Sequence, residues 1–229
     1  MKSHAYIVAG CKEWNRQAFE ALTQGRHEAW RFVRNDEELR STLTAISPRY
    51  IFFLHWNWRV PAEVWRGFEC VCFHMTDVPY GRGGTPLQNL IAAGYENTVV
   101  TALRMVEDMD AGPVYVKRPM SLEGRAIDVY KRAGAISVDI IRWMVQAEPA
   151  PQPQAGEPVI FKRRTPAQSA LPTDADLVGI YNHIRMLDAP GYPLAFIEYG
   201  QFRVEFSNAR LADEEIVAEV VIRKRPRKD

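Results

Sequence analysis

The residue types best suited to chemistry lie between Leu54 and Pro113. Cys70, Cys72 and His74 alternate along one predicted strand, so their side chains point to one face. Zinc ligands usually come as close pairs with a second pair elsewhere, and the remaining histidines, at positions 4, 27, 55 and 183, form no companion pair. We therefore expect no metal. The sequence favours catalysis centred on His74, because imidazole changes its protonation near neutral pH; a buried structural histidine is the alternative.

A glycine-rich segment follows this strand. Residues 79–86 read PYGRGGTP, and their three glycines permit backbone shapes and close approaches that a Cβ would block. A loop placed after a strand and before a helix is a usual ligand-binding position in α/β sheets. The Gly-Lys-Ser/Thr ending of a P-loop is missing. An ordinary tight connection is the alternative reading.

Two carboxylates, Asp108 and Asp110, stand in a predicted turn that ends at Gly112-Pro113. Taken alone, such a turn reads as a solvated acidic connection between strands. Its position after the other two segments gives it more weight.

In this order, the three segments resemble the folate-dependent formyltransferases, which include methionyl-tRNA formyltransferases, glycinamide ribonucleotide transformylases and sugar N-formyltransferases. The family pattern is Asn-x-His-x-Ser-x-Leu-Pro, then a loop with Arg-Gly and a Pro before a helix, then an Asp-x-Gly turn. The matching stretches are CFHMTDVP at 72–79, GRGGTPLQ at 81–88 and MDAGP at 109–113. The resemblance covers roughly residues 50–120 in specific motifs and the rest by layout, and is closest to the branch that acts on nucleotide-linked amino sugars.

The resemblance implies an enzyme that moves a formyl group from 10-formyltetrahydrofolate, its co-substrate, to an amine. His74 would take the proton of the attacking amine, and Asp110 would orient the imidazole and stabilise its cation. The family's Asn falls on Cys72, and a thiol is a poor hydrogen-bond donor. Cys72, Asn57 and Thr76 are the candidates for the oxyanion and auxiliary positions; a nucleophilic Cys72 in a formyl-thioester relay is the alternative.

The resemblance also implies binding residues. The folate would lie at the loop after the third strand and at the acidic turn, against Trp56, Asn57, Trp58, Arg59, Val60, Asp108 and Met109. Trp56 and Trp58 share a side of the chain and could flank an aromatic ligand, with core packing as the alternative. The acceptor would meet the glycine-rich loop, at Tyr80, Gly81, Arg82, Gly83, Gly84 and Gln88.

The acceptor is inferred from charge and from the C-terminal part. The formal net charge is +1 with a pI near 7.7, so no general field attracts nucleic acid or an anionic membrane. The run YNHIRMLDAPGYP at 181–193 resembles the segment that opens the C-terminal part of sugar N-formyltransferases. We expect a reduced folate and a nucleotide-linked amino sugar as partners, expect neither nucleic acid nor membrane, and leave a homodimer open. The alternatives are a hydroxyornithine-type amine, methionyl-tRNA, or a non-catalytic folate- or nucleotide-sugar-binding module.

Composition sets the compartment and the core. The 229 residues are 47% hydrophobic and 25% charged, enough for one full core and a small appended part. Three cysteines make no disulfide framework. The first residues lack a signal-peptide pattern, and no stretch approaches the roughly 20 apolar residues that span a bilayer. These features predict a cytoplasmic protein.

The order of elements predicts an α/β fold: a doubly wound, mainly parallel, Rossmann-like formyltransferase core with a small C-terminal α+β appendage. Strands are expected near residues 5–9, 30–33, 50–54, 68–74, 98–105, 113–116, 194–199, 202–206 and 216–222. Helices are expected after Gly10 and near 36–45, 61–65, 87–93, 124–145 and 174–187. Proline-rich stretches at 147–156 and 165–173 predict linkers, and we place the catalytic domain at 1–165 and the C-terminal subdomain at 166–229. The basic tail 223–228 is expected to be frayed.

Overall fold

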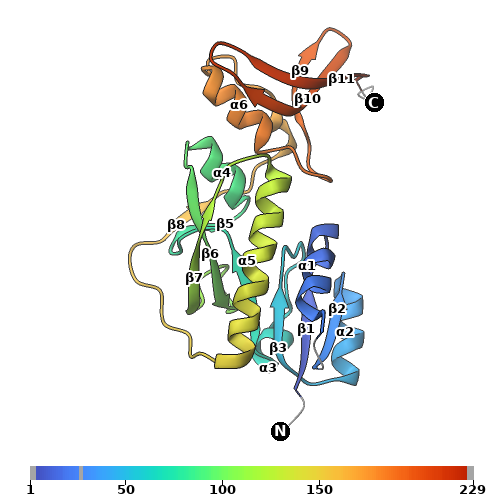
Figure 1. Cartoon of the computed structure of the whole chain (residues 1–229), viewed down its shortest axis with the longest axis vertical. Helices are drawn as coiled ribbons and strands as arrows, with labels where there is room; N and C mark the ends of the chain where they lie inside the picture. The colour runs from blue at the N-terminus through green and yellow to red at the C-terminus, as the bar shows by residue number, and fades with distance from the viewer. Residues whose placement is uncertain (1–3, 26–27, 226–229) are drawn as a thin grey trace. The chain divides into compact units, whose positions relative to one another are not determined.

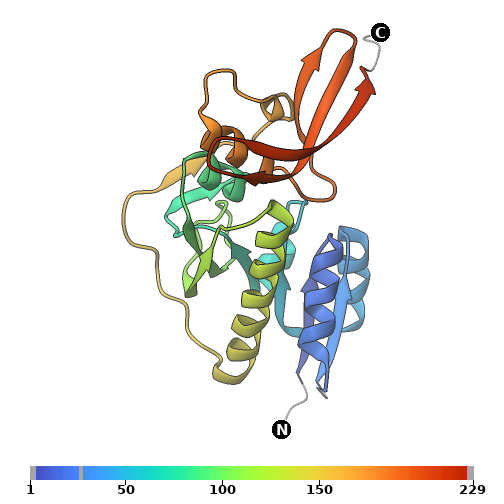
Figure 2. The same cartoon turned by 45° about the horizontal axis from the view of Figure 1, so that its top comes forward.

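The computed structural model describes residues 4–25 and 28–225, drawn in Figures 1 and 2. Contacts divide the chain into two compact units, and each is described by itself. Of the described residues, the first unit holds 4–25, 28–83, 98–120 and 130–160. The second unit holds residues 84–97, 121–129 and 161–225.

A six-stranded sheet in the order β2-β1-β3-β4-β6-β7 organises the first unit. The first four strands in that order are parallel, whereas β6 runs antiparallel to β4. The strands are β1 (Ala5–Ala9), β2 (Ala29–Val33), β3 (Pro48–Phe53), β4 (Cys70–His74), β6 (Asn97–Arg104) and β7 (Val114–Ser121). The predicted mainly parallel sheet is confirmed.

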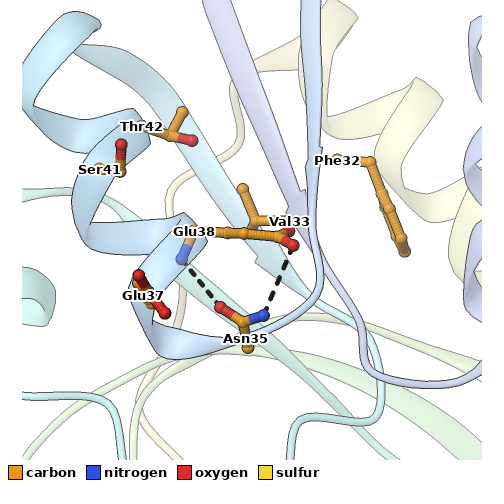
Figure 3. A pocket seen from close by; sticks show the side chains of 7 residues that line it. All are labelled: Phe32, Val33, Asn35, Glu37, Glu38, Ser41 and Thr42. Atoms are coloured by element: carbon orange, nitrogen blue, oxygen red, sulfur yellow. Dashed lines mark hydrogen bonds between the residues drawn. The ribbon is translucent and has the colours of Figure 1, made fainter.

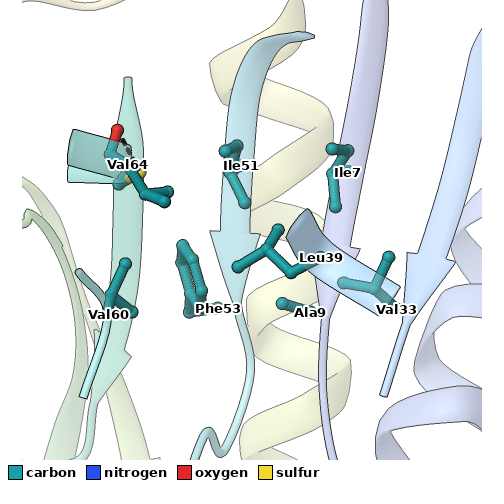
Figure 4. Close-up of a cluster of buried hydrophobic side chains, with 9 residues drawn as sticks. Ile7, Ala9, Val33, Leu39, Ile51, Phe53, Val60 and Val64 are labelled. Atoms are coloured by element: carbon teal, nitrogen blue, oxygen red, sulfur yellow. Dashed lines mark hydrogen bonds between the residues drawn. The ribbon is translucent and has the colours of Figure 1, made fainter. Parts of the chain in front are cut away.

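Helices supply side chains to both faces of this sheet. They are α1 (Glu13–Thr23), α2 (Asp36–Ala45), α3 (Ala62–Gly67) and α5 (Ala126–Ala147), the last of which enters the first unit at residue 130. Figure 4 shows Leu39 of α2 beside Ile7, Ile51 and Phe53 of the neighbouring strands. Successive strand residues point to opposite faces, and Tyr50 and Phe52, which alternate with Ile51 and Phe53, are also buried. The unbroken apolar run of β3 therefore reflects burial on both faces.

The second unit contains α4 (Pro86–Ala92), a short 3₁₀ helix η1 (Pro166–Ser169), α6 (Leu177–Arg185) and a three-stranded antiparallel sheet. Its strands are β9 (Ala195–Tyr199), β10 (Phe202–Leu211) and β11 (Ile216–Lys224). Gly200, at φ 56°, and Gln201 form the predicted hairpin between the first two. α6 packs on β10, and its first turn is capped by Asp176, whose carboxylate accepts the Gly179 N–H. The predicted helix and strands of this part are confirmed.

Two expectations about irregular segments, the glycine-rich loop and the basic tail, need correction. The glycine-rich loop contains a short strand, β5 (Tyr80–Gly83), paired with β8 (Val159–Phe161), which the sequence did not predict. Both are too short for a periodic signal.

The proline-rich segment 147–156 is irregular as expected, yet Gln152 makes backbone hydrogen bonds with Val114 in both directions, at 2.7 and 2.8 Å. In the basic tail, Arg223 and Lys224 belong to β11 rather than a frayed end, because β10 supplies their backbone partners; residues 226–228 lie outside the described residues.

Candidate active site

His74 ends β4, next to Thr101 of β6 in the sheet register. The carboxyl ends of parallel strands share one edge of a sheet, where α/β proteins bind ligands. The His74 side chain is 9% exposed, and its Nε2 lies 2.8 Å from the carbonyl oxygen of Gly81. A carbonyl only accepts, so Nε2 carries a hydrogen and donates it. In the neutral imidazole, the basic nitrogen is therefore Nδ1.

Asp110 faces that basic nitrogen from the turn between β6 and β7. Its Oδ2 lies 3.6 Å from His74 Nδ1, and the side chain is 14% exposed. The same Oδ2 accepts the Gly83 N–H at 2.9 Å. The backbone at Asp110 is left-handed, with φ 54°, a conformation that Asp tolerates better than most residues. Two predicted site residues, from distant segments, are thus brought together.

This geometry suits a proton acceptor. At 3.6 Å, Asp110 makes no direct hydrogen bond to the neutral ring, so it is the Gly81 carbonyl that orients the imidazole. Once Nδ1 gains a proton, the adjacent carboxylate stabilises the cation. The site can therefore take a proton from a substrate group at Nδ1 and hold it in a sheltered position.

Gln154, which the sequence did not single out, joins the two loops of the site. Its Nε2 donates to the carbonyl oxygens of Asp110 and Gly112, each at 2.8 Å. Its Oε1 accepts from Arg82 Nε at 3.1 Å and Nη2 at 2.8 Å. No sequence signal separates Gln154 from Gln152 in the run PQPQ, because only the fold gives one of them these partners.

The three oxyanion candidates have different surroundings. Burial raises the pKa of the Cys72 thiol well above its usual range, and the charge of Asp110 raises it further. The Thr76 hydroxyl is buried and donates to the Gly81 carbonyl at 3.2 Å. Asn57 is exposed in the loop after β3. Asn57 is thus the candidate whose side chain can still turn a strong donor toward a ligand.

The predicted folate segment, 55–61, follows β3 at the same edge of the sheet. Trp56 and Trp58 meet edge to face, with ring centroids 4.9 Å apart at 63°. For a third ring to fit between two flat rings, the two rings must lie about 7 Å apart, twice a van der Waals contact. Trp56 and Trp58 are closer than this and do not sandwich a ligand. Trp58 is nevertheless 44% exposed, and the buried Trp56 Nε1 has no hydrogen-bond partner within the described residues. Arg59 is exposed beside them, and Val60 is buried in the core.

The remaining predicted binding residues fall into two groups. Asp108 and Met109 are exposed in the acidic turn of the first unit, Met109 at 72%. Tyr80 lies partly buried in β5. Gly84 and Gln88 belong to the second unit: a Cβ at Gly84 would lie 2.6 Å from that of Arg163, and the buried Gln88 side chain donates to the Met186 carbonyl.

A surface hollow in the first unit, beside the start of α2, is lined by none of these residues (Figure 3). Its lining is Phe32, Val33, Asn35, Glu37, Glu38, Ser41 and Thr42. Asn35 caps the helix by accepting the Glu38 N–H at 2.9 Å. Asn35 and Glu38 stabilise the start of the helix, and no lining residue is a predicted site residue.

Among residues 4–25 and 28–225, no group of three or more His, Cys, Asp or Glu side chains is placed to hold a metal ion. Within the same part of the chain, no helix is long and apolar enough to cross a membrane.

Comparison with known proteins gives consistent matches. The family described as methionyl-tRNA formyltransferase, C-terminal domain, matches residues 166–223. A solved methionyl-tRNA formyltransferase from Clostridium thermocellum is 40% identical with a TM-score of 0.93, covering 96% of this chain and 99% of that one. A sugar N-formyltransferase structure from Shewanella sp. shares the fold at 14% identity, with a TM-score of 0.65 and coverage of 94% and 96%.

Among curated proteins, a methionyl-tRNA formyltransferase from Bacillus cytotoxicus is 28% identical over 72% of this chain and 54% of its own length. The chain thus spans about half the length of the curated relatives it matches.

The fold and site define an α/β protein with a sheltered His–Asp pair at the carboxyl edge of its sheet. The extent and identity of the match to the Clostridium protein go further: this chain belongs to the formyltransferase family.

Proposed function

We propose that the protein transfers a formyl group from 10-formyltetrahydrofolate to a primary amine. The observation that carries the proposal is the His74–Asp110 pair, in which Gly81 fixes the Nε2 proton and leaves Nδ1 as the base beside a carboxylate. Amine formylation needs one sheltered base and no redox chemistry. The family membership supports the same reaction.

The reaction balances with these residues. The amine nitrogen attacks the formyl carbon and forms a C–N bond, giving a tetrahedral oxyanion, while the nitrogen loses a proton to His74 Nδ1. Asp110 stabilises the resulting imidazolium. Collapse of the intermediate breaks the bond to the folate nitrogen, which receives a proton, and His74 returns to its neutral form. Asn57 is the proposed side-chain donor to the oxyanion.

The residues present fit a folate. The loop after β3 leaves the Trp58 ring exposed, and the Trp56 indole N–H is buried without a partner in the described chain, so a ligand acceptor would satisfy it. Met109 exposes a large apolar side chain next to Asp110 in sequence. Trp56, Asn57, Trp58, Arg59, Val60, Asp108 and Met109 are the proposed folate-binding residues.

We propose a nucleotide-linked amino sugar as the acceptor, met by Tyr80, Gly81, Arg82, Gly83, Gly84 and Gln88. Charge supports a small acceptor. Residues 166–229 contain ten Asp or Glu and eight Lys or Arg. On the C-terminal sheet, Arg203 and Arg225 pair with Glu198, and Arg223 pairs with Glu205. A surface whose cations are neutralised internally is poorly suited to a chain of phosphates.

Methionyl-tRNA is the second candidate acceptor. It is favoured by the names of the 40% identical Clostridium protein and of the curated Bacillus relatives, and by the family match over residues 166–223. That match begins where we place the boundary between the proposed domains 1–165 and 166–229.

A turnover assay tests the proposal. Purified protein is given 10-formyltetrahydrofolate with UDP- and dTDP-linked amino sugars, hydroxyornithine or methionyl-tRNA, and tetrahydrofolate release is followed. We expect turnover with one amino sugar. His74→Ala and Asp110→Ala should each lose about a hundredfold or more in kcat, with folate affinity within a few fold; His4→Ala, at an exposed histidine, is the control. Folate binding without turnover on any amine would favour a binding module instead.

A further inference from the structure

The proline-rich segment 147–156, before β8, is ordered and is called the strap here, because it bonds to the loops of the active site. Gln152 pairs with Val114 through two backbone hydrogen bonds, and the Val159 N–H donates to the Pro79 carbonyl at 3.0 Å. Gln154 lies between these two attachments and is partly buried. All of these residues belong to the first unit. The strap is thus attached at two points. One is at Val114, after the Asp110 turn, and the other is at Pro79, before the glycine-rich loop.

The Gln154 carboxamide is fully used and can adopt only one orientation. Both Nε2 hydrogens go to carbonyl oxygens, of Asp110 and Gly112, which cannot donate. Oε1 accepts two hydrogens from the Arg82 guanidinium, which cannot accept. In the flipped orientation, the amide NH₂ would face the N–H donors of Arg82, and the amide oxygen would face the two carbonyl oxygens. The orientation of the amide therefore follows from the chemistry of its partners.

We propose that Gln154 is a positioning residue that holds the Asp110 turn against His74. The inference rests on the proposed function, in which Asp110 acts beside the His74 base. Asp110 sits in the left-handed region, and its carboxylate must meet Nδ1 while accepting the Gly83 N–H. Pinning the carbonyls of residues 110 and 112 fixes the backbone that carries this carboxylate. Misplacement of a catalytic group by about 1 Å can cost on the order of a hundredfold in rate.

The chemistry explains why an amide serves here. A glutamate could accept from Arg82 but, when ionised, could donate to neither carbonyl. It would also place a second negative charge close to Asp110. Gln154→Glu therefore separates the two sets of hydrogen bonds, because it keeps those from Arg82 and removes those to the carbonyls of the turn.

The experiment uses the whole 229-residue chain and five variants. Gln154→Met keeps the side-chain length and removes all four hydrogen bonds, and Gln154→Glu removes the two to the turn. Gln152→Met is the matched control, since that side chain is exposed in the same strap. Asp110→Asn and its combination with Gln154→Met complete a double-mutant cycle. The readouts are kcat, KM for 10-formyltetrahydrofolate, the melting temperature, and the hydrogen-exchange rate of the Gly83 amide without substrate.

Gln154→Met and Gln154→Glu should each lower kcat by roughly 10- to 100-fold, with KM within about threefold. Gly83 exchange should rise at least about tenfold, since Asp110 no longer holds its N–H. In the Asp110→Asn background, Gln154→Met should add less than about twofold, because the contact acts through Asp110. Gln152→Met should change none of these.

Unchanged kcat in Gln154→Met would overturn the inference. So would a loss of kcat in the Asp110→Asn background equal to the loss that Gln154→Met causes in the wild type, because that result would indicate a merely structural contact. If the wild-type protein turns over no amine, the proposed function fails separately. Gly83 exchange then decides alone: a faster rate in Gln154→Met supports the positioning role, and an unchanged rate overturns it.

Discussion

Cys72 and His74 stand two residues apart on β4, yet their surroundings give them opposite reactivity. Nδ1 of His74 lies 3.6 Å from the Asp110 carboxylate, where it can act as the base. The same carboxylate, added to burial, raises the pKa of the Cys72 thiol well above its usual range. The thiolate is the nucleophilic form of cysteine, so the formyl-thioester route is disfavoured.

Substitution of Cys72 should therefore spare the reaction. We expect Cys72→Ala to keep kcat within about threefold, since a weak donor is removed. Cys72→Asn, which restores the residue type of the family pattern, should be as active or faster. Steady-state turnover with the accepted amine measures both, and circular dichroism checks that the variants fold. A folded Cys72→Ala protein with a hundredfold loss in kcat would bring the thiol back into the mechanism.

His55, in the loop after β3, makes stability depend on pH. Its ring packs edge-on against Trp14 and Tyr130, at centroid distances of 5.6 and 5.0 Å. Burial, and secondly the charge of Lys12, lowers the pKa of His55 from its ordinary 6.5 to about 4. Between these two values the unfolded chain binds more protons than the folded chain. Stability from this group is therefore complete above pH 6.5 and is lost as the pH falls toward 4.

We expect this loss to reach roughly 3 kcal/mol, from about 1.4 kcal/mol per pKa unit. The measurement is urea unfolding between pH 4.5 and 7.5 for the wild-type protein and His55→Gln. The wild-type curve should fall more steeply toward acid, and the difference between the two curves isolates His55 from the carboxylates. His4→Gln, at an exposed histidine, should follow the wild type. Parallel curves for wild type and His55→Gln would contradict the prediction.

At the scale of elements, the turn between β6 and β7 depends on a close backbone approach. A Cβ at Gly112 would lie 1.7 Å from the carbonyl oxygen of Arg104, inside any allowed contact. The Arg104 N–H is bonded to the Pro113 carbonyl at 2.9 Å, so neither strand end can easily move. The glycine of the Asp-x-Gly pattern thus allows the turn to close under Asp110.

Gly112→Ala should open this turn. We expect a stability loss of about 1 to 3 kcal/mol, by analogy with overpacked sites, and a fall in kcat larger than that in folate affinity. Gly67→Ala is the control, because beyond its own helix backbone and chain neighbours its added Cβ meets open space, and its stability should stay within about 0.5 kcal/mol. Denaturant unfolding and turnover check both variants. A Gly112→Ala protein with wild-type stability and kcat would show that the turn can relax at no cost.

Elements with a long apolar signal could be predicted from the sequence. The run Tyr50–Leu54 is buried on both faces, and its composition indicated this directly. β5 and β8 could not be predicted, since each is short and is a strand only because the other pairs with it. The same holds for the strap, whose partners at Val114 and Pro79 are distant in sequence.

The residues of the candidate site could be predicted from the sequence, but not the contacts that orient them. His74 and Asp110 were identified by motif order, and the fold brings them together. The orientation of the imidazole by a carbonyl of Gly81 has no residue type to signal it, because every residue has a carbonyl. The contact between Trp56 and Trp58 depends on side-chain rotamers, which the shared side of the loop did not determine.

At the scale of the whole molecule, charge balance bears on the choice of acceptor. The chain carries 29 Lys or Arg and 28 Asp or Glu, and the described C-terminal sheet pairs several of its arginines with glutamates. An acceptor held through many phosphate contacts would need unpaired cations in number. An amino sugar on a nucleotide diphosphate presents only about two such charges.

Salt dependence therefore separates the two candidate acceptors. Between 50 and 200 mM NaCl, kcat/KM for a nucleotide-linked amino sugar should fall by less than about tenfold, the loss expected from about two phosphate contacts. An acceptor bound through six or more phosphates would lose about a thousandfold over the same range. Steady-state kinetics at four salt concentrations measure the slope, with KM for 10-formyltetrahydrofolate followed in parallel to correct for salt effects on the donor. A steep slope confined to the acceptor would contradict the amino-sugar assignment and favour methionyl-tRNA, because only a long phosphate backbone releases that many counterions.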